Sequence, residues 1–341
     1  MSRNSVRRMG IRAGIIAVVL PGIAEPQRAE VVSAATAKGI VVLRASFASR
    51  GELHSFALEI SLDGQTFVDA EVGALRGLRL SDRMVKGAAN GAQETVLMVP
   101  VVGRLGLGAE KFLFPEPGAY KLRWDIAFRD GEVGDLKINQ SLYVKPATKP
   151  DLEFIARIGD RRFWKEVLGV DPPEGGTTEL LALGVIAAAL QYAEDDPGEE
   201  GSLRGELKWA DAWFALAQEL PDSSYAPYAG YAGGRIYRGH LGRDLDLARE
   251  QITPRAREHT MYRKAEKALT FAVEHGDAFL RPRALCSLAY LRVCSASWDE
   301  AEKYLAQAEE GAGGQGNVLR VINEMRRDVG RLKERSAGHQ P

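Results

Sequence analysis

Between residues 39 and 145, apolar and polar positions alternate with a period of about two, which is typical of strands with one buried face. The clearest run, 120–128, places a large apolar side chain at every second position. Asp63-Gly64 and Asp130-Gly131 provide tight-turn signals after two of the runs. About seven such strands, with no long helical pattern between them, predict an antiparallel β-sandwich over 39–145.

After the proline-containing linker 146–150, the period becomes helical. Small, large and small apolar residues recur at spacings of four and three, and a stripe of this kind lets a helix pack closely against its neighbours. The three stripes are Ala210, Phe214 and Ala217; Ala265, Leu269 and Ala272; and Ala301, Leu305 and Ala308. We therefore expect helices over 151–310, followed by a C-terminal helix over 317–336 that covers the last apolar face.

The helical stripes also repeat along the chain. Ala265 and Ala301 lie 36 positions apart, whereas Ala210 and Ala265 lie 55 apart. The pattern over about 177–310 resembles the tetratricopeptide repeat family of the bacterial envelope, whose period is about 34 residues. In that family about six positions separate the aromatic residues of the two paired helices, so the resemblance implies an insertion of 19 residues between Tyr237 and Tyr262, and without it the longer spacing is also 36. The resemblance implies that the first helix of each pair lines a concave groove.

The strand region carries a second resemblance, which is confined to nine residues. Phe114-Pro115-Glu116-Pro117-Gly118-Ala119-Tyr120-Lys121-Leu122 resembles the strand entry of immunoglobulin-like and fibronectin-like domains in exported bacterial proteins. It implies that the sandwich is immunoglobulin-like and that Tyr120 secures a corner between its sheets. Trp124 and Phe128 share a face with Tyr120, so a place in the core is favoured over a carbohydrate platform.

The first 24 residues have the three-part pattern of a secretory signal. Arg3, Arg7, Arg8 and Arg12 precede an apolar run over 13–23. The run ends in Gly22-Ile23-Ala24, whose small residues Gly22 and Ala24 suit the cleavage site of a signal peptidase. The pattern predicts a cleaved signal peptide, a flexible lead-in over 25–38, and an exported, periplasmic or extracellular protein with no stable membrane anchor. An uncleaved anchor and a twin-arginine route, suggested by Arg7-Arg8, are the alternatives.

Composition narrows the function classes. The 45 Lys and Arg residues nearly balance the 46 Asp and Glu residues, so the charge does not favour nucleic acid as a partner. Cleavage of the signal would remove four arginines and shift the net charge from −1 to −5. Cys286 and Cys294 are eight positions apart on one predicted helix and are expected to be free thiols. The five histidines lack metal-pair spacing, so neither a metal nor a cofactor is expected.

The resemblance to tetratricopeptide repeats assigns groove positions to two helices. In the middle unit they are Tyr228, Tyr231, Arg235 and Arg238, and in the last unit they are Arg283, Cys286, Tyr290, Val293 and Cys294. Aromatic and arginine side chains together grip an extended peptide by stacking and by bidentate contacts to carboxylates. We therefore expect a protein or peptide partner with acidic or C-terminal carboxylate groups.

The resulting hypothesis is an exported, non-catalytic interaction scaffold, present as a monomer or a weak homodimer. One alternative is a hydrolytic or glycan-processing enzyme with its site at the domain junction, in the segment 151–164. The polar residues of that segment are Arg157, Asp160, Arg161 and Arg162. Another alternative is a carbohydrate-binding module formed by the strand region.

Overall fold

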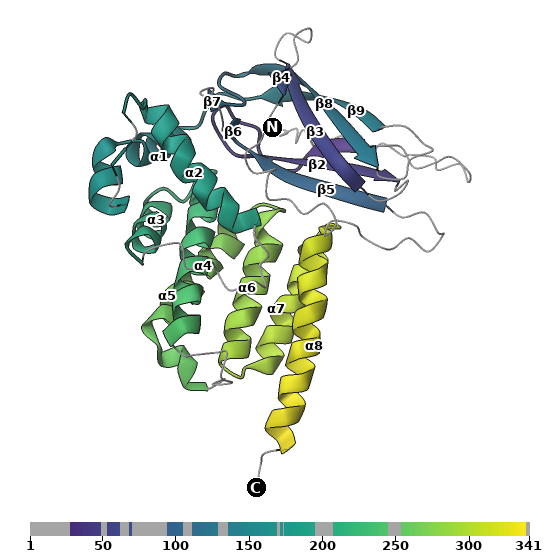
Figure 1. Ribbon diagram of the computed structural model, residues 1–341, viewed down its shortest axis with the longest axis vertical. Coiled ribbons are helices and arrows are strands. Elements are labelled where there is room, and N and C mark those ends of the chain that lie inside the picture. Colours follow the sequence, from purple (N-terminus) through teal and green to yellow (C-terminus); the bar gives the residue numbers. More distant parts are fainter. Residues whose placement is uncertain are drawn as a thin grey trace, which may run out of the picture.

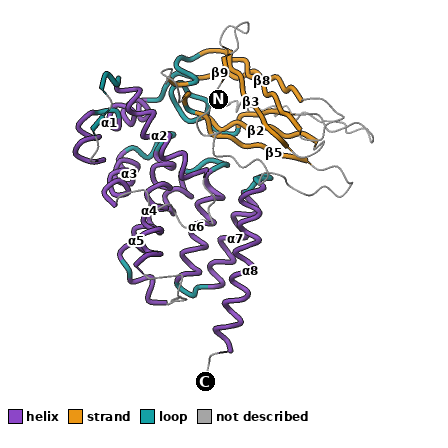
Figure 2. Tube along the Cα trace, viewed as in Figure 1, coloured by secondary structure: helices purple, strands orange, loops and turns teal. Residues whose placement is uncertain are grey.

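The computed structural model describes residues 28–48, 53–61, 68–69, 94–104, 111–128, 136–168, 171–172, 174–194, 207–244 and 254–338. The predicted signal peptide, both predicted tight turns and the centre of the 19-residue insertion lie outside these ranges. Figure 2 shows the described strands gathered at one end of the molecule and the helices at the other.

The described strands form three small antiparallel sheets (Figure 1). The three-stranded sheet has the order β1 (Arg28–Val31), β2 (Val41–Ala48) and β5 (Glu94–Val101). The four-stranded sheet has the order β4 (Val68–Asp69), β3 (Leu53–Ser61), β8 (Gly118–Phe128) and β9 (Leu136–Val144). A short pair joins β6 (Gly103–Arg104) to β7 (Lys111–Phe112). Residues 28–31, expected in a flexible lead-in, therefore form a strand.

The predicted immunoglobulin-like β-sandwich is wrong. The described strands are divided among sheets of three, four and two strands, and more of the described residues lie in helices than in strands. The region around β2 shows one physical reason. Val41 and Leu43 pack in one apolar cluster with the four-stranded sheet, whereas Ile40 and Val42 pack in another with the helices. A sheet covered on both faces is an inner layer, not half of a two-layer sandwich.

The C-terminal part contains eight α-helices and two short helical turns in the described residues. They are α1 (Lys149–Ile158), a π-helix (Phe163–Leu168), α2 (Thr178–Glu194), α3 (Leu207–Glu219), α4 (Ala226–Asp244), a 3-10 helix (Pro254–Glu258), α5 (Thr260–His275), α6 (Leu280–Cys294), α7 (Trp298–Gly311) and α8 (Gly316–Gly338). From α3 to α8, each helix packs against the next. No described helix is both long and apolar enough to cross a membrane.

The apolar stripes of the helical part are buried, as their spacing predicts. Ala265 and Leu269 of α5 are fully buried. A Cβ atom added to Gly234 of α4 would lie only 2.7 Å from the Leu269 side chain, so glycine permits this close approach of α4 and α5. Val318 and Ile322 of α8 pack on α6 and α7 in a cluster of their own. Nothing in this packing identifies the helices as tetratricopeptide repeats.

A buried polar contact joins the strand region to the helices. Asp151 of α1 is 1% exposed, and its Oδ1 accepts hydrogen bonds from Ser223 Oγ at 2.9 Å, Ser224 N at 2.7 Å and Ser224 Oγ at 3.0 Å. Ser224 Oγ in turn accepts from the backbone N–H of Ile40 at 3.1 Å. Tyr225 OH donates to the backbone carbonyl of Lys38. The residues just before β2 are thus tied to the turn that precedes α4.

Candidate functional site

The structure brings predicted binding residues of α4 and α6 together. On α4, Tyr228, Tyr231, Arg235 and Arg238 follow spacings of three, four and three, which places them on one face of the helix. Arg238 Nη1 donates to Ser287 Oγ of α6 at 3.4 Å, and its guanidinium carbon lies 4.7 Å from the centre of the Tyr290 ring. Arg238 and Tyr290 therefore form a cation–π pair across the two helices.

The other predicted residues lie in separate places. Tyr228 OH donates to Asp277 Oδ2 at 2.8 Å, in the turn before α6. Arg283 donates to the Phe279 carbonyl at 2.8 Å and to the side chain of Gln315, near the start of α8. The predicted set thus reduces to four residues that lie close together, which we call the arginine–tyrosine cluster: Tyr231, Arg235, Arg238 and Tyr290.

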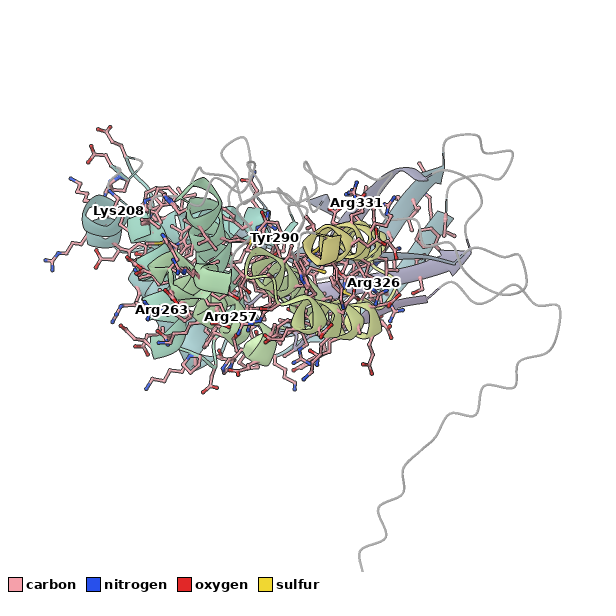
Figure 3. The ribbon with its side chains drawn as sticks, turned by 90° about the horizontal axis from the view of Figure 1, so that it is seen from below. Lys208, Arg257, Arg263, Tyr290, Arg326 and Arg331 are labelled. Carbon is pink, nitrogen blue, oxygen red and sulfur yellow. The ribbon has the colours of Figure 1, made fainter. Side chains whose placement is uncertain are left out.

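The arginine–tyrosine cluster lies mostly in the interior. Tyr231 and Arg235 are 0% exposed and Arg238 is 1% exposed, whereas Tyr290 is half-buried. Seen along the helices in Figure 3, Tyr290 lies between Arg263 of α5 and Arg326 of α8. The sequence predicted which residues share a face of α4, but it placed all four cluster residues on an open groove. In the structure, Tyr290 is the member of the cluster that reaches the surface.

The remaining predicted positions of α6 are also largely covered. Cys286 and Cys294 are buried free thiols, as their spacing predicts, and Val293 is half-buried. Both cysteines pack in the helical interior and form no disulfide.

Burial perturbs the electrostatics of the cluster. Removal from water, followed by the neighbouring Arg235 charge, lowers the pKa of Arg238 to about 10. Tyr290, Tyr231 and Cys294 oppose this shift. Arg235 Nη1 donates to the Tyr231 hydroxyl at 3.2 Å. Two guanidinium groups thus share a region of low dielectric, where an added carboxylate would be stabilised more strongly than in water.

Sequence reasoning missed a network around Arg292 of α6. Arg292 donates to Glu266 of α5 at 2.5 Å and to Tyr262 OH at 2.6 Å, and its Nε lies 2.7 Å from a carboxylate oxygen of Glu300 in α7. Burial favours the neutral form, but the hydrogen bonds and charges of Glu266 and Tyr262 together outweigh burial, so the pKa of Arg292 is raised. The three helices are thereby joined by one side chain. No spacing in the sequence signals contacts between residues 26 and 30 positions apart.

Asp277 is the second missed residue. Its Oδ1 accepts from the backbone N–H groups of Phe279 at 2.9 Å and Leu280 at 3.0 Å, at the beginning of α6. Burial raises the pKa of Asp277, and hydrogen bonds from Leu280 and Tyr228 oppose the rise. Asp277 therefore connects the start of α6 with Tyr228, the first of the predicted binding residues of α4. An aspartate followed by a helix is a recognisable signal for this role.

Replacing Asp277 with alanine is expected to lower the free energy of unfolding by about 1–2 kcal/mol, because two helix N–H groups lose their acceptor. Asp277→Asn keeps an acceptor oxygen and avoids burying a charge, so it should lose less than half as much. Urea unfolding followed by circular dichroism measures both. An Asn variant as unstable as the Ala variant would show that the charge, not the hydrogen bonding, stabilises this turn.

The junction that the enzyme hypothesis selected does not converge on a site. Arg157 pairs with Glu219 at 2.7 Å, and Asp160 Oδ1 accepts from the backbone of Arg162 at 2.8 Å. These residues and Arg161 are exposed, whereas Asp151 is occupied by the serines of the α4 turn. In the part of the chain that the structure describes, no group of three His, Cys, Asp or Glu side chains is placed to hold a metal ion.

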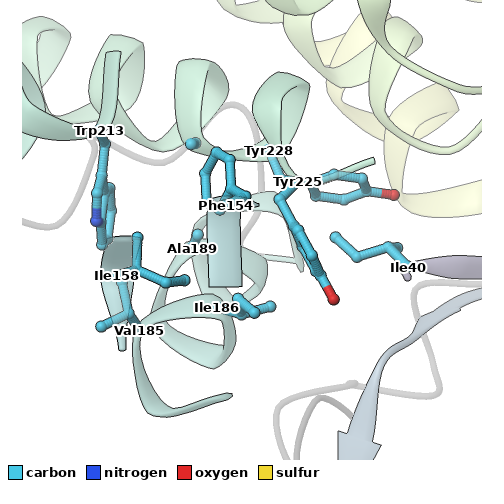
Figure 4. Close-up of a pocket in the computed structure, with 10 residues that line it drawn as sticks. Ile40, Phe154, Ile158, Val185, Ile186, Ala189, Trp213, Tyr225 and Tyr228 are labelled. Carbon is cyan, nitrogen blue, oxygen red and sulfur yellow. The ribbon is translucent and has the colours of Figure 1, made fainter. Parts of the chain in front are cut away.

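A small apolar pocket lies beside α1 (Figure 4). Ile40, Phe154, Trp213 and Tyr228 are among its lining residues. Its volume of about 10 Å³ is the space of a single water molecule. The pocket is therefore a packing gap where α1, α2 and the start of α4 meet.

Comparisons with known proteins give no match: no family model, no curated protein and no solved structure is similar to this chain.

Proposed function

We propose that the protein is an exported, non-catalytic interaction scaffold that binds an acidic segment of a peptide or protein partner at the arginine–tyrosine cluster. The observation that carries the proposal is the meeting of Arg238 with Tyr290 beside Arg235. Export rests on the residue pattern of 1–24 alone.

The electrostatics of the cluster support an acidic ligand. Arg238 has a lowered pKa because it is buried next to a second guanidinium, so a carboxylate that reaches it relieves this repulsion. Arginine also offers a planar pair of donors that matches a carboxylate. Tyr290 is the half-buried member and stacks on Arg238, so the partner enters beside its ring.

Fluorescence anisotropy with a labelled hexaglutamate peptide tests the proposal, with hexaglutamine as the uncharged probe. The full chain should bind hexaglutamate, and Arg238→Gln should weaken binding by about tenfold or more, since a charge-assisted contact contributes about 1.5–3 kcal/mol. Tyr290→Ala uncovers Arg238 and should change affinity without deleting a charge.

Lys264→Gln is the matched control, because Lys264 is a cation elsewhere in the helical part that pairs with Asp211 at 2.6 Å. It should leave hexaglutamate binding unchanged. Thermal unfolding establishes that each variant is folded. Equal affinity of folded wild type, Arg238→Gln and Tyr290→Ala would refute the proposal, as would equal binding of hexaglutamine.

A further inference from the structure

The four-stranded sheet has an exposed face on the side opposite its apolar core. Along β9, Leu136, Ile138, Leu142 and Val144 are buried, whereas Lys137, Asn139, Ser141 and Tyr143 are exposed. The same alternation holds along β8. We call this surface the outer face; its members are Glu59, Ala119, Lys121, Arg123, Asp125, Lys137, Asn139, Ser141, Tyr143 and, directly after β9, Lys145.

Tyr143 is the prominent side chain of the outer face. It is 68% exposed, and among the described residues only Leu152 is another large hydrophobic side chain with high exposure. In the strand register Tyr143 lies opposite Ala119, whose methyl group is too small to cover the tyrosine ring. Lys121 lies opposite Ser141 and is therefore a diagonal neighbour of Tyr143, at about 7–8 Å between backbones. The ring thus stands uncovered among polar groups.

The charge of the outer face is positive. Arg123 pairs with Glu59 at 3.0 Å, and Lys137 lies 3.6 Å from Asp125. Over the residues that the structure describes, Lys121 and Lys145 form no ion pair, and both are exposed. The outer face therefore carries four basic side chains and two carboxylates, although the whole chain has a net charge of −1.

We propose that the outer face binds a polysaccharide that carries carboxylate groups. A sugar ring offers a flat C–H surface that stacks on an exposed tyrosine, and its hydroxyl groups match short polar neighbours such as Asn139 and Ser141. Lys121 and Lys145 supply charge for the carboxylates. A partner chain that adds a strand would use the edge of a sheet, not its face. No residue of the arginine–tyrosine cluster takes part, so this surface is independent of the proposed peptide site.

Affinity electrophoresis of the full chain in gels with polygalacturonate tests the proposal, with fully methyl-esterified polygalacturonate as the uncharged probe. The wild type should be retarded by polygalacturonate at 150 mM salt. Tyr143→Ala should weaken binding by about tenfold, the effect of losing a central aromatic anchor, whereas Tyr143→Phe keeps the ring and the retardation. Lys121→Gln/Lys145→Gln should lose the preference for the charged polymer.

Leu152→Ala is the matched control, because it removes an exposed large hydrophobic side chain from α1, away from the outer face. It should migrate as the wild type does. The proposal is overturned if the wild type is not retarded, or if Tyr143→Ala is retarded equally. It is also overturned if polyglutamate retards the chain in a Tyr143-dependent way, since the surface would then be a peptide site.

Discussion

Replacing Asp151 with alanine is expected to lower the free energy of unfolding by about 3–5 kcal/mol, because three hydrogen bonds lose their acceptor and each orphaned buried donor costs about 1–3 kcal/mol. Asp151 is 1% exposed and accepts from both Ser223 and Ser224. Ser224 Oγ also accepts from Ile40 N, so the loss should extend to the residue just before β2. Urea unfolding gives the stability, and hydrogen exchange at the Ile40 amide reports the loosened junction.

Two controls separate the hydrogen-bond network from general packing. Leu152→Ala changes the next residue of α1, which is exposed, and should alter stability by less than about 0.5 kcal/mol. In a double-mutant cycle with Ser224→Ala, the two losses should be less than additive, because both substitutions remove the hydrogen bond from Ser224 Oγ to Asp151. Additive losses, or protection of Ile40 that is unchanged in Asp151→Ala, would contradict the assigned role of Asp151.

The strand pattern predicted local structure better than architecture. The alternation over 120–128 corresponds to β8, and the inward residues Leu122, Trp124 and Ile126 are fully buried. The layer arrangement was missed because Ile40-Val41-Val42-Leu43 is apolar without alternation, which is the pattern of a strand covered on both faces. The sequence does not say what covers the second face, and helices far along the chain do so.

The candidate site was predictable in part for a related reason. Helical spacing places Tyr231, Arg235 and Arg238 on one side of α4, and that is how they lie. Spacing carries no information on how deeply that side is buried. The contacts of Arg292 and Asp277 form between helices that meet only after folding. Their partners lie up to 49 positions away in the sequence, so no local spacing predicts them.

Raising the pH above 10 is expected to destabilise the fold steeply, because buried tyrosines must ionise. Burial, followed by the charges of Asp151 and Glu179, raises the pKa of Tyr225 well above its usual value of 10.0. Burial and the hydrogen bond to Asp211 raise the pKa of Tyr237. Burial also raises the pKa of Tyr120, against the opposing hydrogen bond to the Glu116 carbonyl.

A raised pKa in the folded chain contributes stability that is complete below pH 10 and is lost as the pH rises toward the folded-state value. Each tyrosine that stays protonated in the folded chain but ionises in the unfolded chain lowers the free energy of unfolding by about 1.4 kcal/mol per pH unit above pH 10. Arg238 acts in the opposite direction, because its pKa of about 10 in the folded chain lies below its pKa in the unfolded chain. Loss of the Arg238 proton in the folded chain therefore offsets about 1.4 kcal/mol of this destabilisation per pH unit above pH 10.

The pH dependence of urea unfolding between pH 9.5 and 11.5, read by circular dichroism, measures the number of protons released. Tyr237→Phe should lower that number by about one, and this slope is insensitive to the separate loss of the Asp211 hydrogen bond. Tyr143→Phe removes an exposed hydroxyl and serves as the control. If Tyr237→Phe and the wild type release the same number of protons, Tyr237 is not the group whose burial opposes ionisation. The absorbance of tyrosinate at 295 nm, recorded in parallel, should rise in the same transition in which the helices unfold.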